Sequence, residues 1–115
     1  MKIAFDNIGD LSATFLSHNA EKGNVVTMYS PKAVTPASDA SDFVGVCTFS
    51  DGGAATVKVK GFVTVSYTGS MVAPGVRKII CSGPDSIRLA ADEEIGREVL
   101  VVDADSTAKI ATILL

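Results

Sequence analysis

Residues 55–67 read ATVKVKGFVTVSY, and the apolar side chains fall on alternate positions. The odd positions are apolar or small as far as Tyr67, whereas the even positions are polar except for Phe62. Successive side chains of a β-strand point to opposite faces, so the pattern predicts a long strand of an antiparallel sheet with one face on the core. Gly61 interrupts the pattern, and a glycine inside a strand often marks a bulge or a sharp bend in a barrel.

The stretch before this strand predicts its partner. Residues 43–49 read FVGVCTF and are followed by Ser50, Asp51 and two glycines. Asp-Gly between two apolar runs is a strong hairpin signal, because both residue types tolerate positive φ. We therefore expect residues 43–50 and 54–67 to pair directly.

Short apolar runs separated by turn residues continue through the rest of the chain. They are residues 13–16, 24–28, 33–35, 76–81, 86–89, 98–102 and 109–115. Strands at such spacing predict an all-β fold, a small antiparallel β-barrel or sandwich of about seven to nine short strands. The last two runs are expected to form a terminal hairpin. Residues 90–95 allow at most one short helical turn, and the sequence shows no internal repeat.

Length and charge narrow the possible roles. The chain has 115 residues, the usual size of one domain, and we expect a flexible N-terminal arm over residues 1–11 and a single β domain over residues 12–115. The net charge is -3, and the charged residues are spread over the chain without the basic stripe that nucleic-acid binding needs, so we expect no nucleic-acid partner. No apolar run approaches the roughly 20 residues of a spanning helix, so we expect no membrane partner. Asp6 stands where a signal peptide would be apolar, so we expect folding in the cytoplasm.

Residue types suited to catalysis or metal binding are sparse. His18 is the only histidine and lies in a polar stretch, so we interpret it as a surface residue. The acidic residues 92–94 and 103–106 lack the spacing of a calcium loop, and one histidine with two distant cysteines cannot complete a zinc site. We therefore expect no catalytic residues, no metal and no cofactor, and we interpret the chain as a non-enzyme. Cys47 and Cys81 are expected to be buried and reduced.

Phe62 is the first candidate for a contact surface. By the alternation it faces away from the core, beside a loop that contains Met71 and Val72. An apolar side chain in the middle of a sheet can form the centre of a subunit contact. A bulge at Gly61 would instead turn Phe62 into the core, and the sequence leaves both interpretations open.

The order of these motifs resembles that of the small all-β head decoration proteins of phages and prophages. Each motif alone is an ordinary strand or turn pattern, and the resemblance lies in their order over residues 12–115. The motifs are residues 13–16 (ATFL), 21–26 (EKGNVV), 43–46 (FVGV), 51–63 (DGGAATVKVKGFV), 74–75 (PG) and 96–102 (GREVLVV), followed by the run to Leu115.

The resemblance implies a β-barrel-like domain that assembles as a homo-oligomer, in particular a homotrimer. It implies docking on the major capsid protein at the virion surface, after synthesis in the host bacterial cytoplasm, and it implies no catalytic residues. The N-terminal arm carries Ile3, Phe5 and Ile8, and we expect it to contribute to subunit or capsid contacts.

Two rival functions remain. A ligand-binding β module, in particular one for carbohydrate, needs exposed aromatic rings as platforms. The chain has no Trp, and Tyr29 and Tyr67 are the obvious candidates. A hydrolase would need an ordered set of acid, base and nucleophile, which a single histidine does not provide.

Overall fold

Ten β-strands make up the part of the chain that the computed structural model describes, residues 10–70 and 72–115, and this part contains no helix. The all-β prediction is confirmed, with more strands than the sequence suggested. The strands are β1 (Leu11–Ser17), β2 (Val25–Ser30), β3 (Ala33–Pro36), β4 (Gly45–Ser50), β5 (Ala54–Lys60), β6 (Phe62–Tyr67), β7 (Gly75–Gly83), β8 (Ser86–Leu89), β9 (Arg97–Asp105) and β10 (Ile110–Leu114).

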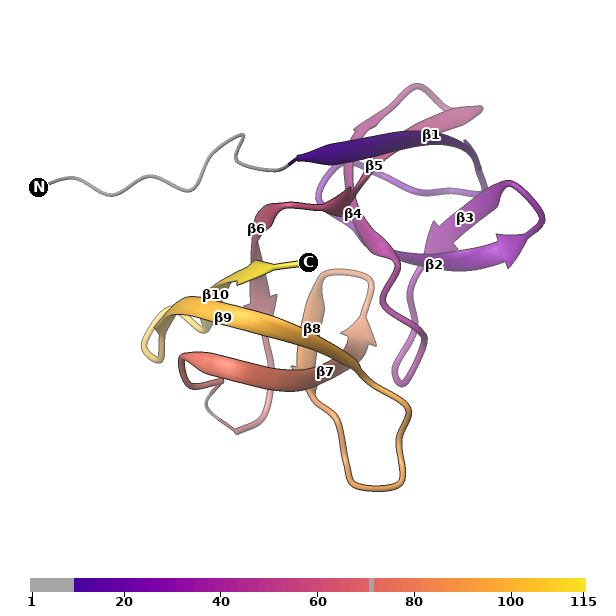
Figure 1. Ribbon diagram of the computed structural model, residues 1–115. Helices are drawn as coiled ribbons and strands as arrows, with labels where there is room; N and C mark the ends of the chain where they lie inside the picture. Colours follow the sequence, from indigo (N-terminus) through magenta and orange to yellow (C-terminus); the bar gives the residue numbers. More distant parts are fainter. Residues whose placement is uncertain (1–9, 71) are drawn as a thin grey trace, which may run out of the picture.

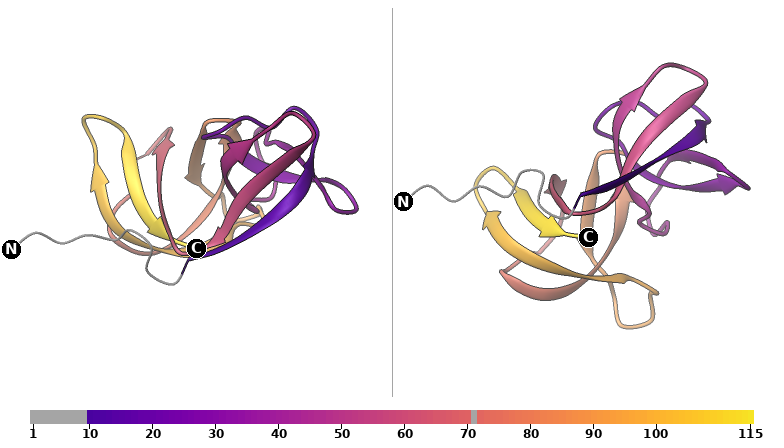
Figure 2. Two further views of the ribbon diagram at one scale, coloured as in Figure 1. Left: turned by 90° about the horizontal axis from the view of Figure 1, so that it is seen from above. Right: turned by 45° about the horizontal axis from the view of Figure 1, so that its top comes forward.

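The strands form two small barrels of five strands each, which lie side by side (Figure 1, Figure 2). Barrel 1 has the strand order β1-β3-β2-β4-β5, and barrel 2 has the order β10-β6-β8-β7-β9. Each barrel contains one parallel pair, β1 with β3 and β6 with β8. The sheets are therefore mixed, and not purely antiparallel as the sequence analysis expected.

The strand predicted over residues 54–67 is broken at Gly61, which has a φ of 110°. A Cβ atom at this position would collide with the Asp10 side chain, so the connection between the barrels requires glycine. The inward alternation nevertheless continues on both sides, with Val57 buried in barrel 1 and Val63 in barrel 2. The predicted pairing holds for β4 with β5, whereas β6 pairs with β10 and β8.

The two barrels share one topology, so the fold contains an internal repeat that the sequence analysis did not find. Strands β1 to β5 correspond in order to β6 to β10, and every strand pairing of barrel 1 recurs in barrel 2. Individual hydrogen bonds recur as well. His18 N–H donates to the Val34 carbonyl, and in the corresponding place Thr68 N–H donates to the Ile87 carbonyl.

Corresponding residues of the two barrels follow from the strand register. The facing residues Met28 and Val34 of β2 and β3 correspond to Cys81 and Ile87 of β7 and β8, and in each hairpin a bulge follows directly. The pairing of β2 with β4 and that of β7 with β9 differ by two residues. An even shift preserves which side chains point outward, because the side-chain period of a strand is two.

Each barrel has an apolar core, and the core of barrel 2 is the larger one and includes residues of barrel 1. The core of barrel 1 consists of Ala20, Val26, Val34, Cys47, Ala55 and Val57. The core of barrel 2 consists of Val63, Val65, Tyr67, Val72, Ile79, Cys81, Ile87, Val99, Val101, Ala111 and Ile113, and it is completed by Val25, Ala37 and Phe43 from barrel 1. Separating the barrels would expose this shared apolar surface to water.

Several smaller predictions can be compared with the strands. The terminal hairpin is confirmed as β9 and β10, and Cys47 and Cys81 are buried and free, in separate cores. Residues 90–95 form a turn between β8 and β9 and no helix. Strand β1 begins at Leu11, the last residue of the expected arm, whereas residues 1–9 lie outside the described residues.

Candidate functional site

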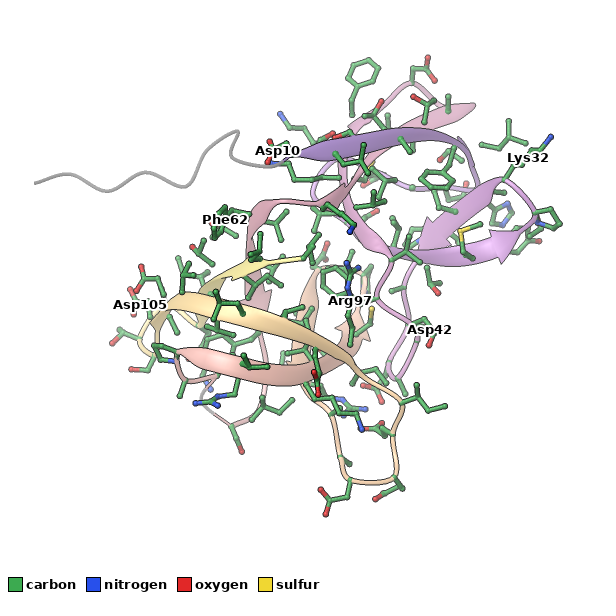
Figure 3. The ribbon with its side chains drawn as sticks, viewed as in Figure 1. Asp10, Lys32, Asp42, Phe62, Arg97 and Asp105 are labelled. Carbon is green, nitrogen blue, oxygen red and sulfur yellow. The ribbon has the colours of Figure 1, made fainter. Side chains whose placement is uncertain are left out.

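An apolar row crosses the outward face of barrel 2. Four side chains on neighbouring strands stand opposite one another in register: Phe62 of β6, Leu114 of β10, Leu100 of β9 and Val76 of β7. Val76 and Leu100 are exposed, and Phe62 and Leu114 are half-buried. Phe62 (labelled in Figure 3) lies on the outward face, as the alternation predicts, while Val63 takes the inward position. We call this set the apolar row.

The structure places the other predicted contact residues differently. Val72 is fully buried in the core of barrel 2, so its side chain packs inside the barrel and does not contribute to a surface. The remaining candidates lie outside the described residues and are Met71, Ile3, Phe5 and Ile8.

The sequence analysis did not single out the three partners of Phe62 in the apolar row. A signal for one of them was present, because residues 99–102 read VLVV. A run of consecutive apolar residues in a strand indicates that both of its faces meet apolar surroundings. In β9 the inward face is covered by the core, and the outward face carries the exposed Leu100.

The end of barrel 1 that carries the β2–β3 hairpin is open and apolar. Met28, Tyr29 and Leu16 are exposed there, and Lys32 marks this end in Figure 3. The His18 ring stacks on the Tyr29 ring with centroids 4.3 Å apart, an arrangement that orients the exposed tyrosine. Beside them lies a hollow of about 340 Å³, lined by Thr14, Phe15, Leu16, Lys32 and Ala54.

The corresponding end of barrel 2 is covered by barrel 1. The covering segment is the loop of residues 37–44 between β3 and β4, which we call the capping loop. In this loop Ala40 N–H donates to the Cys81 carbonyl at 2.9 Å. At the start of β2 in barrel 1, Val25 N–H donates to the Pro84 carbonyl of the β7–β8 hairpin at 2.7 Å. Backbone bonds and apolar burial therefore join the barrels at one place.

Arg97, labelled in Figure 3, connects the two barrels from the start of β9. Its Nη1 donates to the carbonyls of Phe43 at 3.4 Å and Val44 at 3.1 Å, and its Nη2 donates to that of Val59 at 3.2 Å. Burial lowers the pKa of the guanidinium. Carbonyl oxygens of barrel 1 thus satisfy a partly buried cation of barrel 2, which makes Arg97 a structural link.

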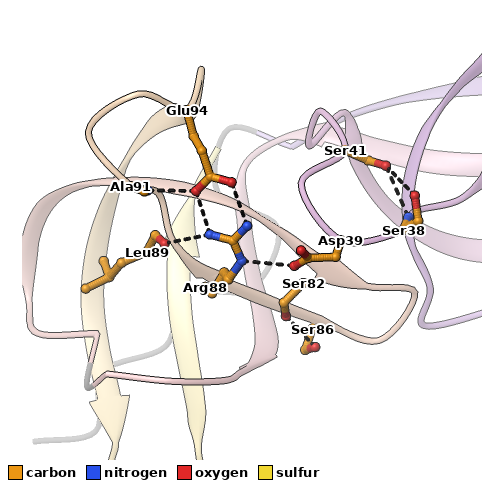
Figure 4. A network of polar contacts seen from close by, with 9 residues as sticks. All are labelled: Ser38, Asp39, Ser41, Ser82, Ser86, Arg88, Leu89, Ala91 and Glu94. Atoms are coloured by element: carbon orange, nitrogen blue, oxygen red, sulfur yellow. Dashed lines mark hydrogen bonds and ion pairs between the residues drawn. The ribbon is translucent and has the colours of Figure 1, made fainter.

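Arg88 on β8 holds two loops at the same time (Figure 4). Its Nη1 and Nη2 donate to the two carboxylate oxygens of Glu94 at 2.6 and 2.7 Å, and its Nε donates to Asp39 of the capping loop at 3.0 Å. The Arg88 hydrogen bonds, followed by that from Ala91 N–H, lower the pKa of the Glu94 carboxyl to about 2, and the carboxylates raise the pKa of Arg88. Groups held in their charged forms this firmly are poorly suited to proton transfer near neutral pH.

The possible metal ligands and the two thiols are the remaining reactive groups of the described residues. Over residues 10–70 and 72–115, no group of three or more His, Cys, Asp and Glu side chains could hold a metal ion. Burial, with a smaller effect of the Asp42 charge, raises the pKa of the Cys81 thiol to about 12, and burial also raises the pKa of Cys47. Both thiols therefore stay protonated and are weak nucleophiles. Tyr67 is buried in the core, which leaves Tyr29 as the exposed tyrosine among the two carbohydrate candidates.

Comparison with known protein families and with curated proteins finds no match for this chain. None of the described residues belongs to a helix with the length and apolar character of a membrane span. What the geometry offers is contact surface, namely the apolar row on barrel 2 and the open end of barrel 1.

Proposed function

We propose that this protein is a non-enzymatic structural protein that acts as a homo-oligomer on the surface of a phage or prophage capsid. Its role would be to decorate and stabilise the shell, with further copies of the chain and the major capsid protein as partners. The observation that carries the proposal is the apolar row, because four outward side chains in register give barrel 2 a face suited to contact with another protein.

The chemistry of the described residues supports contact over turnover. Arg88 and Arg97 are engaged in bonds that hold loops and barrels together, and His18 stacks on Tyr29. A nucleophile needs an adjacent base or a lowered pKa, and the thiols have raised pKa values. The order of motifs that resembles the phage head decoration proteins adds the capsid as the surface on which such a protein acts.

The shape of the molecule also suits a shell surface. The described residues extend 38 × 38 × 21 Å, so the body is broad and flat. A flat protein that buries apolar side chains where capsid subunits meet gains roughly 25 cal/mol for each Å² of apolar surface covered. Binding only to the assembled shell stabilises that shell by mass action.

The test is co-sedimentation of the full chain with capsids assembled from the major capsid protein of the phage or prophage that carries this gene. We expect saturable binding to assembled shells, little binding to the unassembled capsid protein, and a higher melting temperature of the decorated shell. Absence of binding to intact shells at roughly micromolar concentration, the range of a specific weak interface, would refute the proposed function.

A matched pair of variants tests the role of the apolar row. Phe62→Ser is expected to weaken capsid binding at least tenfold, since an aromatic side chain in an interface commonly contributes more than about 1.4 kcal/mol. Phe49→Ser removes the same ring from an exposed position of barrel 1 outside the row and should bind as the parent does. Circular dichroism of both variants checks that they are folded.

A small ligand- or carbohydrate-binding module is the second candidate. The observation in its favour is the exposed Tyr29 near the hollow at the open end of barrel 1. Because His18 covers one face of the Tyr29 ring, a sugar would have only the other face. Calorimetric titration with neutral mono- and disaccharides at millimolar concentration, with Tyr29→Ser as control, decides this candidate.

A further inference from the structure

The internal repeat gives every part of the contact between the barrels a counterpart elsewhere in the molecule. Barrel 1 covers the end of barrel 2 with the capping loop and with the outward side chains of β2 and β4. The counterpart of the covering surface lies on barrel 2, and the counterpart of the covered end lies on barrel 1. Neither counterpart is covered within the described part of a single chain.

The loops show the relation most directly. In barrel 1, Phe43 precedes by two residues Gly45, which pairs with Val26. In barrel 2, Ile95 precedes by two residues Arg97, which pairs with Ile79, the counterpart of Val26. The loops even begin alike, because the backbone bond of Ala37 to Val25 recurs as that of Ala90 to Lys78.

These two corresponding side chains have opposite environments. Phe43 is 6% exposed because it closes the core of barrel 2. Ile95 is 85% exposed, which is the largest exposed fraction among the large apolar side chains of the described residues. We call residues 90–96 the free loop, and Figure 1 shows that it projects from barrel 2. Arg88 links Glu94 of this loop to Asp39 of the capping loop, whereas the Ile95 side chain stays exposed.

The strands beside the loops differ in chemistry. In barrel 1, the paired outward residues Val25 and Val46 pack against the core of barrel 2. The register that makes Ile79 the counterpart of Val26 places the exposed residues Lys78 and Glu98 there in barrel 2. The exposed apolar pair Val76 and Leu100 lies two residues further along the same strands, so Ile95 is the apolar side chain of barrel 2 that repeats the covering contact.

The surface that would be covered is the open end of barrel 1. In barrel 2 the corresponding end is sealed, with Cys81 buried beneath the capping loop. In barrel 1 the counterpart of Cys81 is Met28, which is 46% exposed, and the next residue, Tyr29, is 58% exposed. Both ends are apolar, and they differ in whether a second barrel lies on them.

We propose that copies of this chain associate head to tail, with the free loop of one copy covering the open end of barrel 1 of the next and Ile95 at the centre of the contact. The occupant of each surface is thus a second copy, and the contact inside the chain is the template for the contact between chains. Charge agrees with this arrangement, because the free loop carries Asp92 and Glu93 whereas the open end carries Lys32. This inference specifies how the homo-oligomer of the proposed function forms, and it rests on the proposed function only in that the protein is a homo-oligomer.

A head-to-tail contact joins two different surfaces, so it is heterologous. It closes into a ring when the rotation between copies permits, and otherwise it continues into a filament. A symmetric dimer, in which one surface contacts the same surface of the second copy, does not follow from the repeat. Because the head-to-tail contact uses two different surfaces, variants that each lack one of them can be mixed to test the proposal.

The experiment measures the mass of the full chain by light scattering coupled to size exclusion and by sedimentation. Ile95→Glu removes the covering surface and Tyr29→Glu removes the covered surface, and each variant is expected to be monomeric where the parent is oligomeric. Both positions are exposed, so the substitutions should leave the circular dichroism spectrum and the monomer fold intact. Phe49→Glu, an exposed apolar position outside both surfaces, is the control and should keep the parent mass.

Mixing the two variants gives the decisive result. The Ile95→Glu chain keeps a good open end and the Tyr29→Glu chain keeps a good free loop, so the mixture retains one productive contact. We expect a 1:1 heterodimer that grows no further, while each variant alone stays monomeric. A parent that is monomeric at up to about 100 μM, variants that keep the parent mass, or a mixture without heterodimer would each overturn the proposal.

These outcomes are separate from those of the capsid experiment. A parent that sediments with capsids but is unaffected by both variants refutes the head-to-tail contact and leaves the capsid role standing. A parent that forms the predicted oligomer and heterodimer but ignores capsids refutes the capsid role alone.

Discussion

Barrel 1 and barrel 2 are built from the same strand pairings, and they differ in what lies on one end. The end of barrel 2 is sealed by the capping loop and Phe43, whereas the end of barrel 1 leaves Met28 and Tyr29 exposed. The barrel that is sealed also has the larger core. A five-stranded barrel of this size is thus stabilised not only by its own interior but also by a neighbour that excludes water from its end.

The comparison also separates residues that maintain the fold from residues that are free to bind. Phe43 and Ile95 occupy corresponding places before their strands, and Phe43 is buried because it packs on the core of the neighbouring barrel. The apolar side chains that point outward from barrel 2 among the described residues are the ones that we assign to partners.

The largest expected change in the free energy of unfolding comes from removing the Phe43 side chain that covers the end of barrel 2. Phe43→Ala leaves a cavity at the junction, and we expect the free energy of unfolding to fall by about 3–4 kcal/mol. Ile95→Ala, in the corresponding exposed place, should change it by less than about 0.5 kcal/mol in dilute solution. Urea denaturation at low protein concentration measures both values. An equal decrease in the free energy of unfolding for the two variants would show that Phe43 and Ile95 do not differ in their contribution to stability.

A second comparison concerns the connection between the barrels. Gly61→Ala combines a positive φ of 110° with a collision against Asp10, and we expect a loss of about 2–3 kcal/mol. Gly52→Ala is the control, because Gly52 also has a positive φ, of 92°, but open space around it, and about 1 kcal/mol is expected. Thermal or chemical denaturation of both variants checks the prediction, which fails when the two losses coincide.

The hydrogen bonds of Arg97 between the barrels are expected to contribute less to the free energy of unfolding than Phe43 or Gly61. Arg97→Met keeps an apolar stem but removes the donors to the carbonyls of Phe43, Val44 and Val59, and we expect a loss of about 1–2 kcal/mol. Arg97→Lys keeps the charge and should recover part of that loss. Stability of Arg97→Met equal to that of the parent would mean that water replaces these bonds without cost.

The smallest effect at neutral pH concerns the ion pair that holds the free loop. Because the folded pKa of Glu94 is about 2, below its ordinary value, this carboxylate adds stability above pH 4.5, and the stability is lost as the pH falls towards 2. Glu94→Gln removes this contribution, so its melting temperature should decline less steeply than that of the parent between pH 4.5 and 2. Melting curves at pH 7, 4.5, 3 and 2 provide the measurement, and parallel curves would contradict the assignment.

Much of the repeat has a trace in the sequence, although each trace is short. Ala55-Thr56-Val57 of β5 corresponds to Ala111-Thr112-Ile113 of β10, and Pro31 in the β2–β3 turn corresponds to Pro84 in the β7–β8 turn. These matches become visible once the register relates the strands. Insertions of a few residues between strands and the exchange of one apolar residue for another conceal them in the linear sequence, because a core position requires only suitable volume and polarity.

The candidate surfaces were predictable to a lesser degree. The alternation alone places Phe62 outward, but a bulge at Gly61 that would turn it inward stayed open, and the residues beside Phe62 depend on which strands are neighbours. In the sequence Val72 was an equally suitable candidate for a contact surface, but its side chain is buried. An apolar residue in a loop can pack into a core as readily as it can contact a partner. Ile95 gave no signal, since its importance lies in its correspondence to Phe43.

By itself the sequence determined that the chain is all-β, approximately where most strands lie, and which side chains of residues 55–67 point inward. These features are local, because alternation and turn-forming residues act through the backbone angles of a few neighbouring residues. The tertiary structure alone decided that the stretch divides at Gly61 between two barrels, and that one barrel end is covered while the other is open. A period of two records the face on which a side chain lies but not the strand it will pair with, which depends on contacts between residues far apart in the chain.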